Sequence, residues 1–452
     1  MGNGIRPQRL LGNFNGSMGK FLACADSVRQ CADLGAVRLV KENSDTRDLK
    51  NFFGEDAERL VAFTLSHTLR NALMAQRAVR ALLADWRIVC TKRYSYNGKD
   101  LLVERLAVQV GREEYEFIVE AGVQYWESAE GARMVIRYLV VNHRAPGTFY
   151  EMQFLLPESR HCWLRDLIRR MEAWTDEHHF YRGQTIDAVG EFIRFEEETA
   201  WENVILPDSI RKTLERNCLD LLRHRELYRA NGLPLKRGIL LYGKPGTGKT
   251  MIGRALAQRC GVTFIVATPG LLSRSDDVRR VFSWGRRFAP TILFFEDLDM
   301  VAAGRHSGET AKEILGEFLA GLDGLDSGEG VITIATTNDL AAIEPALKDR
   351  PNRFDVVLEI PPMDDCEPRV FLERWTSKHS QNGLDVENVV GRSDGFTGAQ
   401  MQELCRLAVM EAVEEHVSAG LDGSARLPLC AEHFNLALAR CNGKPRKAMG
   451  FV

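Results

Sequence analysis

The 452-residue sequence lacks any long apolar run. No stretch reaches the roughly 18 apolar residues that a helix needs to cross a bilayer. The segment MVIRYLVV, at 134–141, is short and carries Arg137, so it is typical of a β-strand. We therefore expect a protein without a membrane span.

The sequence also lacks paired cysteines. Its ten cysteines are scattered and none forms a C-x-x-C pair, which predicts free thiols in a reducing compartment. We expect the cytoplasm. The mitochondrial matrix is the alternative, because the first 25 residues contain no acid and include Arg6, Arg9 and Lys20, as transit peptides do.

An excess of basic residues is absent as well. There are 59 Lys and Arg residues against 62 Asp and Glu residues, for a net charge of −3. This balance argues against nucleic acid as a partner. The sequence has no internal repeat and no low-complexity tract, and its length predicts a globular chain of two or three domains.

Residues 1–190 mix helical and strand patterns. Apolar spacing over 55–85 is helical, and five segments rich in Val, Ile, Tyr and Phe follow it. An amphipathic helix beginning at HCWLRDL and a strand in QTIDAVGEFIRF complete the region. We expect an α+β domain with an antiparallel sheet, which contacts a client or partner.

Residues 191–362 change to strands alternating with helices. The five strand candidates are nearly all apolar, as strands buried on both faces of a parallel sheet are. They are GILLYG, TFIVAT, TILFFED, VITIATTN and DVVLEIP. Residues 363–452 show helical patterns only. This order predicts an α/β parallel-sheet core followed by a small α-helical lid.

A glycine-rich loop follows the first of these strands. GILLYGKPGTGKT fits the pattern G-x-x-x-x-G-K-[ST] between a strand and a helix, so the core is of the P-loop NTPase type. Backbone N–H groups can surround phosphate oxygens, Lys249 can reach the β- and γ-phosphates, and Thr250 can ligate Mg²⁺. The expected nucleotide contacts are Gly243, Lys244, Pro245, Gly246, Thr247, Gly248, Lys249, Thr250 and Met251.

Acidic residues end the strand ILFFEDLD. The carboxyl ends of parallel strands form the ligand edge of such sheets. We expect Glu296 to hold Mg²⁺, Asp297 to orient or deprotonate the attacking water, and Asp299 to cap a helix. At the end of VITIATTN, Asn338 is expected to hydrogen-bond the γ-phosphate or the water, and Thr337 is the local alternative.

Two arginines precede the last strand, in IEPALKDRPNRFD. In a ring of subunits, Arg350 and Arg353 could reach a neighbour's site and stabilise charge on the transferred phosphoryl group. In an isolated subunit they would be ordinary surface charges.

Together these motifs resemble the AAA family of ring ATPases, over roughly residues 200–440. The resemblance implies ATP hydrolysis with Mg²⁺, a homo-oligomeric ring that is hexameric or occasionally heptameric, and remodelling of a macromolecular client. In this family the Gly-Ala of GFTGAQ lies near the nucleotide, which maps to Gly398 and Ala399. WENVIL occupies the segment that usually lines the adenine, which makes Asn203, Val204 and Ile205 candidates.

Within the family the sequence is similar to the BCS1-like group. LPLKRGILLYGKPGTGKT, SRSDDVRRVF and the Glu-then-Asp order carry this likeness, and FLLPESRHCWLRDLIRRMEAW followed by QTIDAVGEF resembles the group's middle domain. Because we expect no membrane helix before that domain, a membrane-anchored translocase is not supported. The arginine motif has one residue more than the common L-x-R-x-x-R spacing, which affects Arg350.

The acid order has a geometric consequence. The usual order is Asp then Glu, and here Asp297 occupies the water position. Its carboxylate falls short of a glutamate's by about 1.5 Å, the length of one C–C bond. Because misplacements of about 1 Å can cost on the order of 10²-fold in rate, we predict slow but real hydrolysis.

The segment after the second strand, TPGLLSRSDDVRRVF, lacks the pore aromatic that protein-threading AAA rings usually carry. Phe282 has core spacing, and Leu271 and Leu272 are weak substitutes. We therefore expect an ATP-hydrolysing ring that remodels, disassembles or moves a protein client. The alternatives are a protease-linked unfoldase and a nucleotide-switched assembly scaffold with little turnover.

Overall fold

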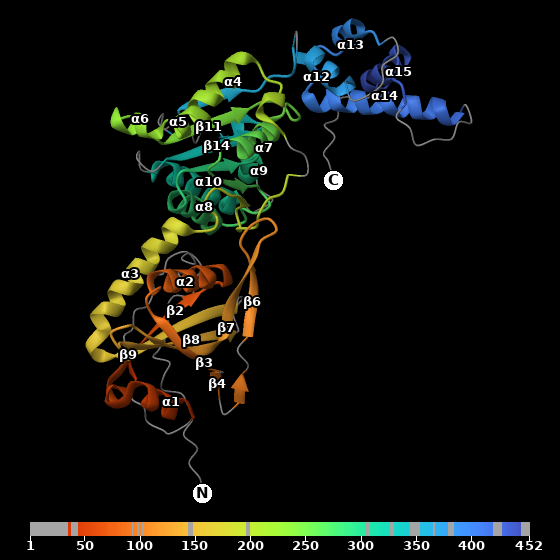
Figure 1. Cartoon of the computed structure of the whole chain (residues 1–452). Coiled ribbons are helices and arrows are strands. Elements are labelled where there is room, and N and C mark those ends of the chain that lie inside the picture. Colours follow the sequence, from red (N-terminus) through yellow and green to blue (C-terminus); the bar gives the residue numbers. More distant parts are fainter. Residues whose placement is uncertain are drawn as a thin grey trace. The chain divides into compact units, whose positions relative to one another are not determined.

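The structure is a computed structural model, and it describes most of the chain. The chain divides into two compact units, Met1–Phe180 and Tyr181–Val452 (Figure 1). Among the described residues, no helix combines the length and the apolar character that crossing a bilayer requires. The described residues are 35–37, 44–92, 94–96, 99–101, 104–142, 148–195, 199–303, 308–325, 330–343, 353–364, 367–377, 384–418 and 427–443.

The N-terminal unit is built on an antiparallel sheet. Its strands pair in the order β1-β2-β9-β8-β7-β3, and β6 pairs with the first half of the long strand β7. A separate hairpin is formed by β4 and β5. The strands are β1 (Gly35–Val37), β2 (Leu60–His67), β3 (Arg87–Lys92), β4 (Tyr94–Tyr96), β5 (Lys99–Leu101), β6 (Glu104–Gln109), β7 (Tyr115–Glu127), β8 (Arg133–Asn142) and β9 (Thr148–Pro157).

Helices cover both faces of this sheet. Successive side chains of a strand point to opposite faces, so one strand contributes residues to both cores. Met134 and Ile136 pack in one core with side chains of α2 and α3. Val135 and Leu155 lie in the opposite core with side chains of α1. This confirms the expected α+β fold of the region. The helices are α1 (Ser44–Phe53), η1 (Gly54–Arg59), α2 (Leu69–Leu82), η2 (Glu158–Arg160) and α3 (His161–His178).

The helix expected over 55–85 is wrong in its first half. Residues 60–67 form β2, which pairs with β9 on one side and β1 on the other. LVAFTLSH is nearly all apolar at its start, and a buried strand and a buried helix share that pattern. Its main pairing partner begins about ninety residues later in the chain, at Thr148, so the local sequence could not reveal it.

The side chain of Gln76 covers the backbone of β7 at Val119. Gln76 Nε2 donates to the Val119 carbonyl at 2.8 Å, and Gln76 Oε1 accepts from the Val119 N–H at 3.0 Å. The pairing of β8 with β7 begins only at Gly122. Because buried backbone groups without a partner cost free energy, Gln76 takes the place of a neighbouring strand here.

The second unit contains a parallel six-stranded sheet in the order β10-β12-β13-β14-β11-β15. The five predicted strands are all present. Every residue of β13 and β14 is buried, which explains their apolar sequences. The strands are β10 (Thr185–Asp187), β11 (Arg237–Tyr242), β12 (Thr263–Ala267), β13 (Thr291–Phe295), β14 (Val331–Thr337) and β15 (Val356–Glu359).

The sixth strand corrects one assignment. We expected QTIDAVGEFIRF to belong to the N-terminal sheet, but its first residues form β10, which pairs in parallel with β12. The division between the units accordingly lies after Phe180, before the expected boundary at 190. A three-residue strand carries almost no information about its partner, so the sequence placed it beside its nearest neighbours in the chain.

Helices surround the parallel sheet, and in the described part of the chain four more form the lid. The lid core contains Leu404 and Ala408 from one helix and Phe434 and Leu438 from another. The expected lid is confirmed. The elements are η3 (Trp201–Asn203), α4 (Asp208–Leu214), the π-helical turn η4 (Glu215–Asp220), α5 (Leu221–Arg223), α6 (Arg225–Ala230), α7 (Lys249–Arg259), α8 (Ser275–Arg287), α9 (Leu298–Ala303), α10 (Gly308–Asp323), and in the lid α12 (Glu367–Thr376), α13 (Val386–Arg392), α14 (Gly398–Ser418) and α15 (Ala431–Gly443).

Candidate functional site

The phosphate loop joins β11 to α7, and its glycines are required by its backbone. Gly246 and Gly248 have φ values of 82° and 98°, in the left-handed region that side chains with a Cβ rarely adopt. A Cβ on Gly243 would lie 2.3 Å from the carbonyl oxygen of Ile360. The chain therefore turns sharply before α7 begins at Lys249.

Lys249 is buried, with 6% of its surface exposed. Its Nζ donates to the carbonyl oxygens of Gly243 and Lys244 at 2.7 and 3.0 Å. Burial lowers the pKa of Lys249, and the charges of Asp297 and Asp299 act in the opposite direction. A buried ammonium at the start of a helix is a binding group for an anion such as phosphate.

Glu296 and Asp297 follow β13 directly, and both are partly buried beside another acid. Burial raises the pKa of Glu296, as does the neighbouring Asp297 charge, while the Thr250 hydroxyl bond and Arg254 oppose this. Burial and then Asp299 raise the pKa of Asp297, against the effects of Lys249 and Asn338. Shifted carboxyl groups of this kind are typical of catalytic sites.

Asp297 also has an unusual backbone. Its φ is +44°, and it is the one non-glycine with positive φ among the residues that the structure describes. Asp and Asn are enriched several-fold in this left-handed region, whereas longer side chains seldom occupy it. The backbone conformation thus gives a physical reason for Asp where the usual order has Glu.

The sensor residue meets the acids across two neighbouring strands. Asn338 follows β14, and its Nδ2 donates to Asp297 Oδ1 at 3.1 Å. The backbone N–H of Asp297 donates to Thr336 Oγ1 at 2.9 Å. Sheet order places β13 beside β14, so residues about forty positions apart in sequence form one polar cluster.

Asp299 belongs to this cluster, which corrects its expected role as a helix cap. Its Oδ1 accepts from the Thr337 hydroxyl and from the Asn338 backbone N–H, both at 2.9 Å. Sequence reasoning missed this contact because both donors lie on another strand. The third acid of EDLD and the hydroxyl-rich end of VITIATTN were the only signals available.

The lid reaches the phosphate loop through Ala399. Its backbone N–H, in the first turn of α14, donates to the Gly246 carbonyl at 3.0 Å. A Cβ on Gly246 would lie 2.8 Å from the Cβ of Ala399. The predicted residues Gly398 and Ala399 therefore lie beside the loop.

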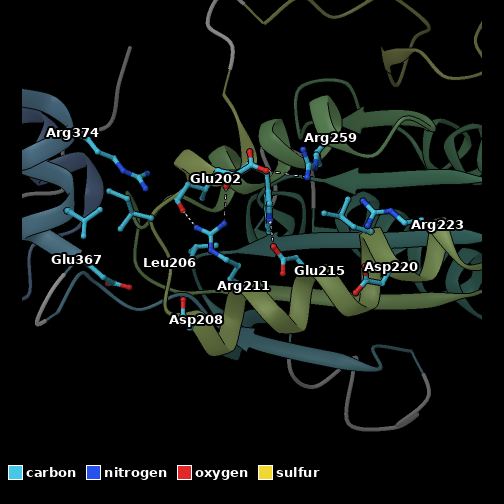
Figure 2. Close-up of a pocket in the computed structure, with 15 residues that line it drawn as sticks. Glu202, Leu206, Asp208, Arg211, Glu215, Asp220, Arg223, Arg259, Glu367 and Arg374 are labelled. Carbon is cyan, nitrogen blue, oxygen red and sulfur yellow. Dashed lines mark hydrogen bonds and ion pairs between the residues drawn. The ribbon is translucent and has the colours of Figure 1, made fainter. Parts of the chain in front are cut away.

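The predicted adenine segment lies beside a cleft of about 650 Å³. Val204 and Ile205 line it, and the Asn203 carbonyl accepts from the Arg374 side chain of the lid helix α12 at 2.9 Å. Charged side chains point into much of this cleft (Figure 2). The phosphate-loop residues do not line it, so the cleft is not the site of the acid–lysine cluster.

The two arginines have different outcomes. Arg350 lies outside the described residues. Arg353 makes a forked ion pair with Asp323 at the end of α10, with Nε–Oδ1 and Nη2–Oδ2 distances of 3.2 and 3.1 Å. Only 12% of the Arg353 side chain is exposed. Its predicted role at a neighbour's site thus requires this pair to open.

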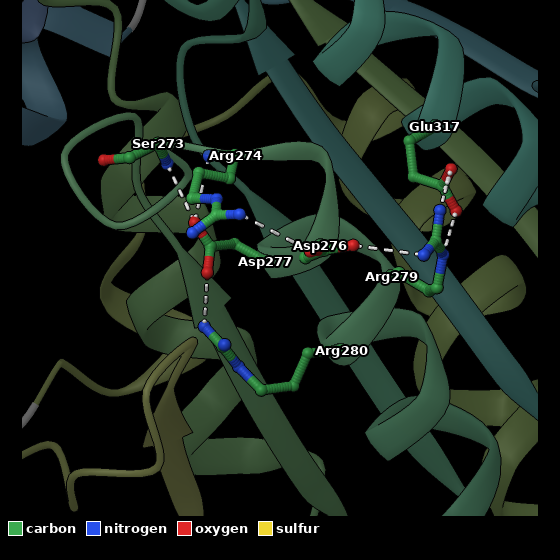
Figure 3. Close-up of polar contacts among 7 residues, drawn as sticks. All are labelled: Ser273, Arg274, Asp276, Asp277, Arg279, Arg280 and Glu317. Atoms are coloured by element: carbon green, nitrogen blue, oxygen red, sulfur yellow. Dashed lines mark hydrogen bonds and ion pairs between the residues drawn. The ribbon is translucent and has the colours of Figure 1, made fainter. Parts of the chain in front are cut away.

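The segment after β12 is fixed in place rather than projecting. The Asp277 carboxylate accepts from the backbone N–H groups of Ser273 and Arg274 and pairs with Arg280 (Figure 3). Leu272 is buried, so it is not a substitute for a pore residue. Phe282 is buried as predicted.

The donor set fits a nucleotide with a divalent cation. The Thr250 hydroxyl bonds to the Glu296 carboxylate, and hydroxyl and carboxylate oxygens are ligands that Mg²⁺ prefers. Lys249, the loop glycines and the first turn of α7 supply the positive groups that phosphate oxygens require. These residues come from α7 and the carboxyl edge of the sheet, as the sequence predicted.

Two family models match parts of the second unit. Residues 239–362 match the model of the "ATPase family associated with various cellular activities (AAA)", and residues 383–424 match the AAA+ lid domain. The cell division cycle protein 48 homolog of Archaeoglobus fulgidus is 36% identical over 210 residues, which cover 44% of this chain and 28% of that protein.

Two further likenesses cover the same region. The 26S proteasome regulatory subunit 6B homolog of Dictyostelium discoideum is 34% identical over 220 residues, which cover 46% of this chain and 54% of that protein. The crystal structure of the FIGL-1 AAA domain in complex with ADP has a TM-score of 0.47 and 23% identity, over 57% of this chain and 88% of that one. The chain thus spans about a quarter to a half of the two relatives.

Proposed function

We propose that this chain, whose second unit is an AAA-type ATP hydrolase domain with its lid, hydrolyses ATP to remodel a protein client. One observation carries the hydrolytic part. The buried Lys249 ammonium, the Asp297 carboxylate and the Asn338 amide meet at the carboxyl edge of one sheet. Ammonium, base and amide are the groups that phosphoryl transfer to water requires.

Each residue has a definite task in this proposal. Loop N–H groups and Lys249 bind the phosphate oxygens and stabilise charge that develops on them. Asp297 orients the attacking water and accepts its proton, for which a raised carboxyl pKa is favourable. Asn338 fixes the direction of the Asp297 carboxylate through the hydrogen bond that its side-chain amide donates. Thr250 and Glu296 would hold Mg²⁺, which neutralises phosphate charge when bound.

The assembly is proposed as a homo-oligomeric ring, hexameric or else heptameric. Arg350 and Arg353 would then serve a neighbouring subunit's site, and Arg353 would have to exchange Asp323 for a phosphate. We place the ring in the cytoplasm, with the mitochondrial matrix as the alternative, and cell fractionation would distinguish them. Mass photometry with and without ATP would test the ring; a protein that stays monomeric in ATP would contradict it.

The BCS1-like group is the proposed place of the chain within the family. The Glu-then-Asp order, the loop approach and the SRSDDVRRVF segment support this. In the segment after β12, Leu272 is buried and Leu271 is half-buried, so the segment exposes little apolar surface that could grip an extended polypeptide. We therefore propose that the client is moved or disassembled, rather than threaded, and that the N-terminal unit selects it.

ATPase assays test the hydrolytic proposal. Lys249→Ala should lower kcat by about 10²- to 10³-fold, since it removes a positioned charge from the developing phosphate charge. Lys212→Ala is the control, because Lys212 is an exposed lysine of α4 that lies outside the phosphate loop, and it should change kcat by less than about threefold. Equal loss in both variants, or no wild-type turnover, would contradict the proposal.

A second candidate is a protease-linked unfoldase. It is favoured by the relative whose name describes a proteasome regulatory subunit. A trap distinguishes the candidates: Asp297→Asn, loaded with ATP, is recovered from cell extract and its bound proteins are identified. A co-purifying peptidase supports the unfoldase, whereas a stable complex without peptidase supports remodelling. Ring formation without any wild-type turnover would instead favour a nucleotide-switched scaffold.

A further inference from the structure

We propose that Asp299 is a positioning residue that sets the geometry of the Asp297–Asn338 pair by tying the end of β14 to the turn after β13. This inference rests on the proposed ATPase function, and deepens it. It assigns a role to an acid for which the sequence suggested only a helix cap.

The contacts of Asp299 lead away from its own helix. Its Oδ1 accepts from Thr337 Oγ1 and from the Asn338 N–H, each at 2.9 Å. Both donors lie at the end of the neighbouring strand, about forty residues further along the chain. A capping residue would instead accept from N–H groups of the first turn of α9, whereas the donors to Asp299 are Thr337 and Asn338 at the end of β14.

The hydrogen bonds to Asp299 restrict Asn338, whose side-chain amide contacts the proposed base Asp297. The Asn338 N–H is fixed by Asp299, while the side-chain amide of the same residue donates to Asp297 Oδ1 at 3.1 Å. Bonds to a charged acceptor are roughly twice as strong as neutral ones. Asp299 therefore restricts the backbone from which the sensor amide projects.

A second reason for this tie is the strained turn itself. Asp297 has φ +44°, and a non-glycine residue in that region costs free energy unless its surroundings hold it. The bond from Asp297 N–H to Thr336 Oγ1 and the two bonds of Asp299 cross-link the same two strand ends on either side of this residue. The strand ends thus hold the base in a conformation that it would otherwise leave.

The short side chain of Asp297 also makes its carboxylate depend on the backbone. A shorter acid has fewer torsions, so its carboxylate direction depends more directly on the backbone than a glutamate's does. Because Asp299 ties the turn that follows Asp297 to the end of β14, the short acid can be aimed without the extra methylene. Asp299 is then the compensation for the inverted acid order.

The experiment compares Asp299→Ala, Asp299→Asn and Asp339→Ala in the full-length chain. Asp339 is the matched control, since it lies beside the same strand end but its carboxylate caps the following residues, accepting from Ala341 N–H at 3.0 Å. We measure kcat, KM for ATP, affinity for a fluorescent ATP analogue and thermal unfolding.

Asp299→Ala should lower kcat by about 10- to 100-fold, because roughly ångström displacements have effects of this size. KM and nucleotide affinity should change less than about twofold. Asp299→Asn keeps an oxygen that can accept both bonds, and should retain kcat within about threefold of wild type. Asp339→Ala should leave kcat near that of wild type.

Two results would overturn the inference. One is wild-type kcat in Asp299→Ala. The other is a loss of nucleotide affinity, thermal stability and kcat in parallel, without recovery in Asp299→Asn, because a merely structural residue would behave in that way. If the wild type itself does not hydrolyse ATP, the proposed function fails first and the hydrolytic role of Asp299 fails with it; if the wild type is active, only the inference is at stake.

Discussion

Four carboxyl groups, two in each unit, lie in opposite electrostatic surroundings. In the N-terminal unit, guanidinium bonds lower the pKa of Glu116, through Arg77, and of Glu127, through Arg87 and Arg133. In the second unit, burial and neighbouring acids raise the pKa of Glu296 and Asp297. The first arrangement favours the charged form, and the second opposes it.

The direction of the pKa shift separates acids that stabilise the fold from acids that we propose to act in catalysis. An acid paired with arginine contributes attraction, although little of it when the pair is exposed. Acids crowded together at a strand end cost stability, and such a cost persists where a function requires it. The following predictions test whether this contrast between the units is real.

Asp297→Asn should give the largest effect and should separate activity from stability. It removes the proposed base, so kcat should fall by about 10²- to 10³-fold. It also removes one charge beside Glu296 and Asp299, so the thermal midpoint should rise. Steady-state ATPase and calorimetry measure the two changes, and a lower midpoint would contradict the proposed repulsion.

Gln76→Leu should lower the free energy of unfolding of the N-terminal unit. Both the N–H and the carbonyl of Val119 would lose their partner, which costs about 2 kcal/mol or more. Urea unfolding of the full chain, with hydrogen exchange to locate the change in β7, measures it. Gln109→Leu is the control, since that amide makes only an exposed bond to the Arg112 carbonyl; equal effects would contradict the assigned role of Gln76.

Lowering the pH should affect the units in opposite directions. Glu116 and Glu127 have lowered pKa values, so their contribution is present above the ordinary carboxyl range and is lost as pH falls through their folded-state values. Glu296 and Asp297 have raised values, so their folded state gains stability as they take up protons below neutral pH.

Hydrogen exchange, corrected for intrinsic rates, measures this difference. Between neutral and mildly acidic pH, protection at the ends of β13 and β14 should rise, while protection in β7 near Glu127 should stay constant and then fall at lower pH. The same direction of change in both regions would contradict the comparison.

The smallest effect is expected for Glu127→Gln. The side chains of its partners Arg87 and Arg133 are 76% and 43% exposed, and pairs so accessible to water contribute little. The urea midpoint should shift only slightly, and ATP turnover should not change. A large loss of turnover would show that the acids of the two units are less separate in function than their surroundings suggest.

Most of the second unit could be predicted because its signals are local. Five strands are nearly all apolar, and the backbone of one short loop requires Gly243, Gly246 and Gly248. What the sequence could not show is pairing across a long separation. The local pattern at 60–67 also fits a helix, and nothing in the sequence around β10 indicates its sheet, since the partners of both strands lie far along the chain.

The same limit applied to the candidate site. The acids and Asn338 were found from their places at strand ends, but the bond from Asn338 to Asp299 joins two strands and leaves no local pattern. The left-handed backbone of Asp297 was also invisible, although the Asp itself was the clue. Arg353 has its predicted position before β15, yet its partner Asp323 was not foreseen.

The hydrogen bond between Gly246 and Ala399 attaches the first turn of α14 to the phosphate loop, so a movement of the loop can tilt the helix. Ala399 lies in the first turn, and the helix continues to Ser418. A helix of this length extends about 30 Å, so a tilt of about 5° at the loop end displaces the far end by roughly 3 Å over that span. A movement at the loop that is too small to see in the sheet is thereby enlarged at the outer end of the lid.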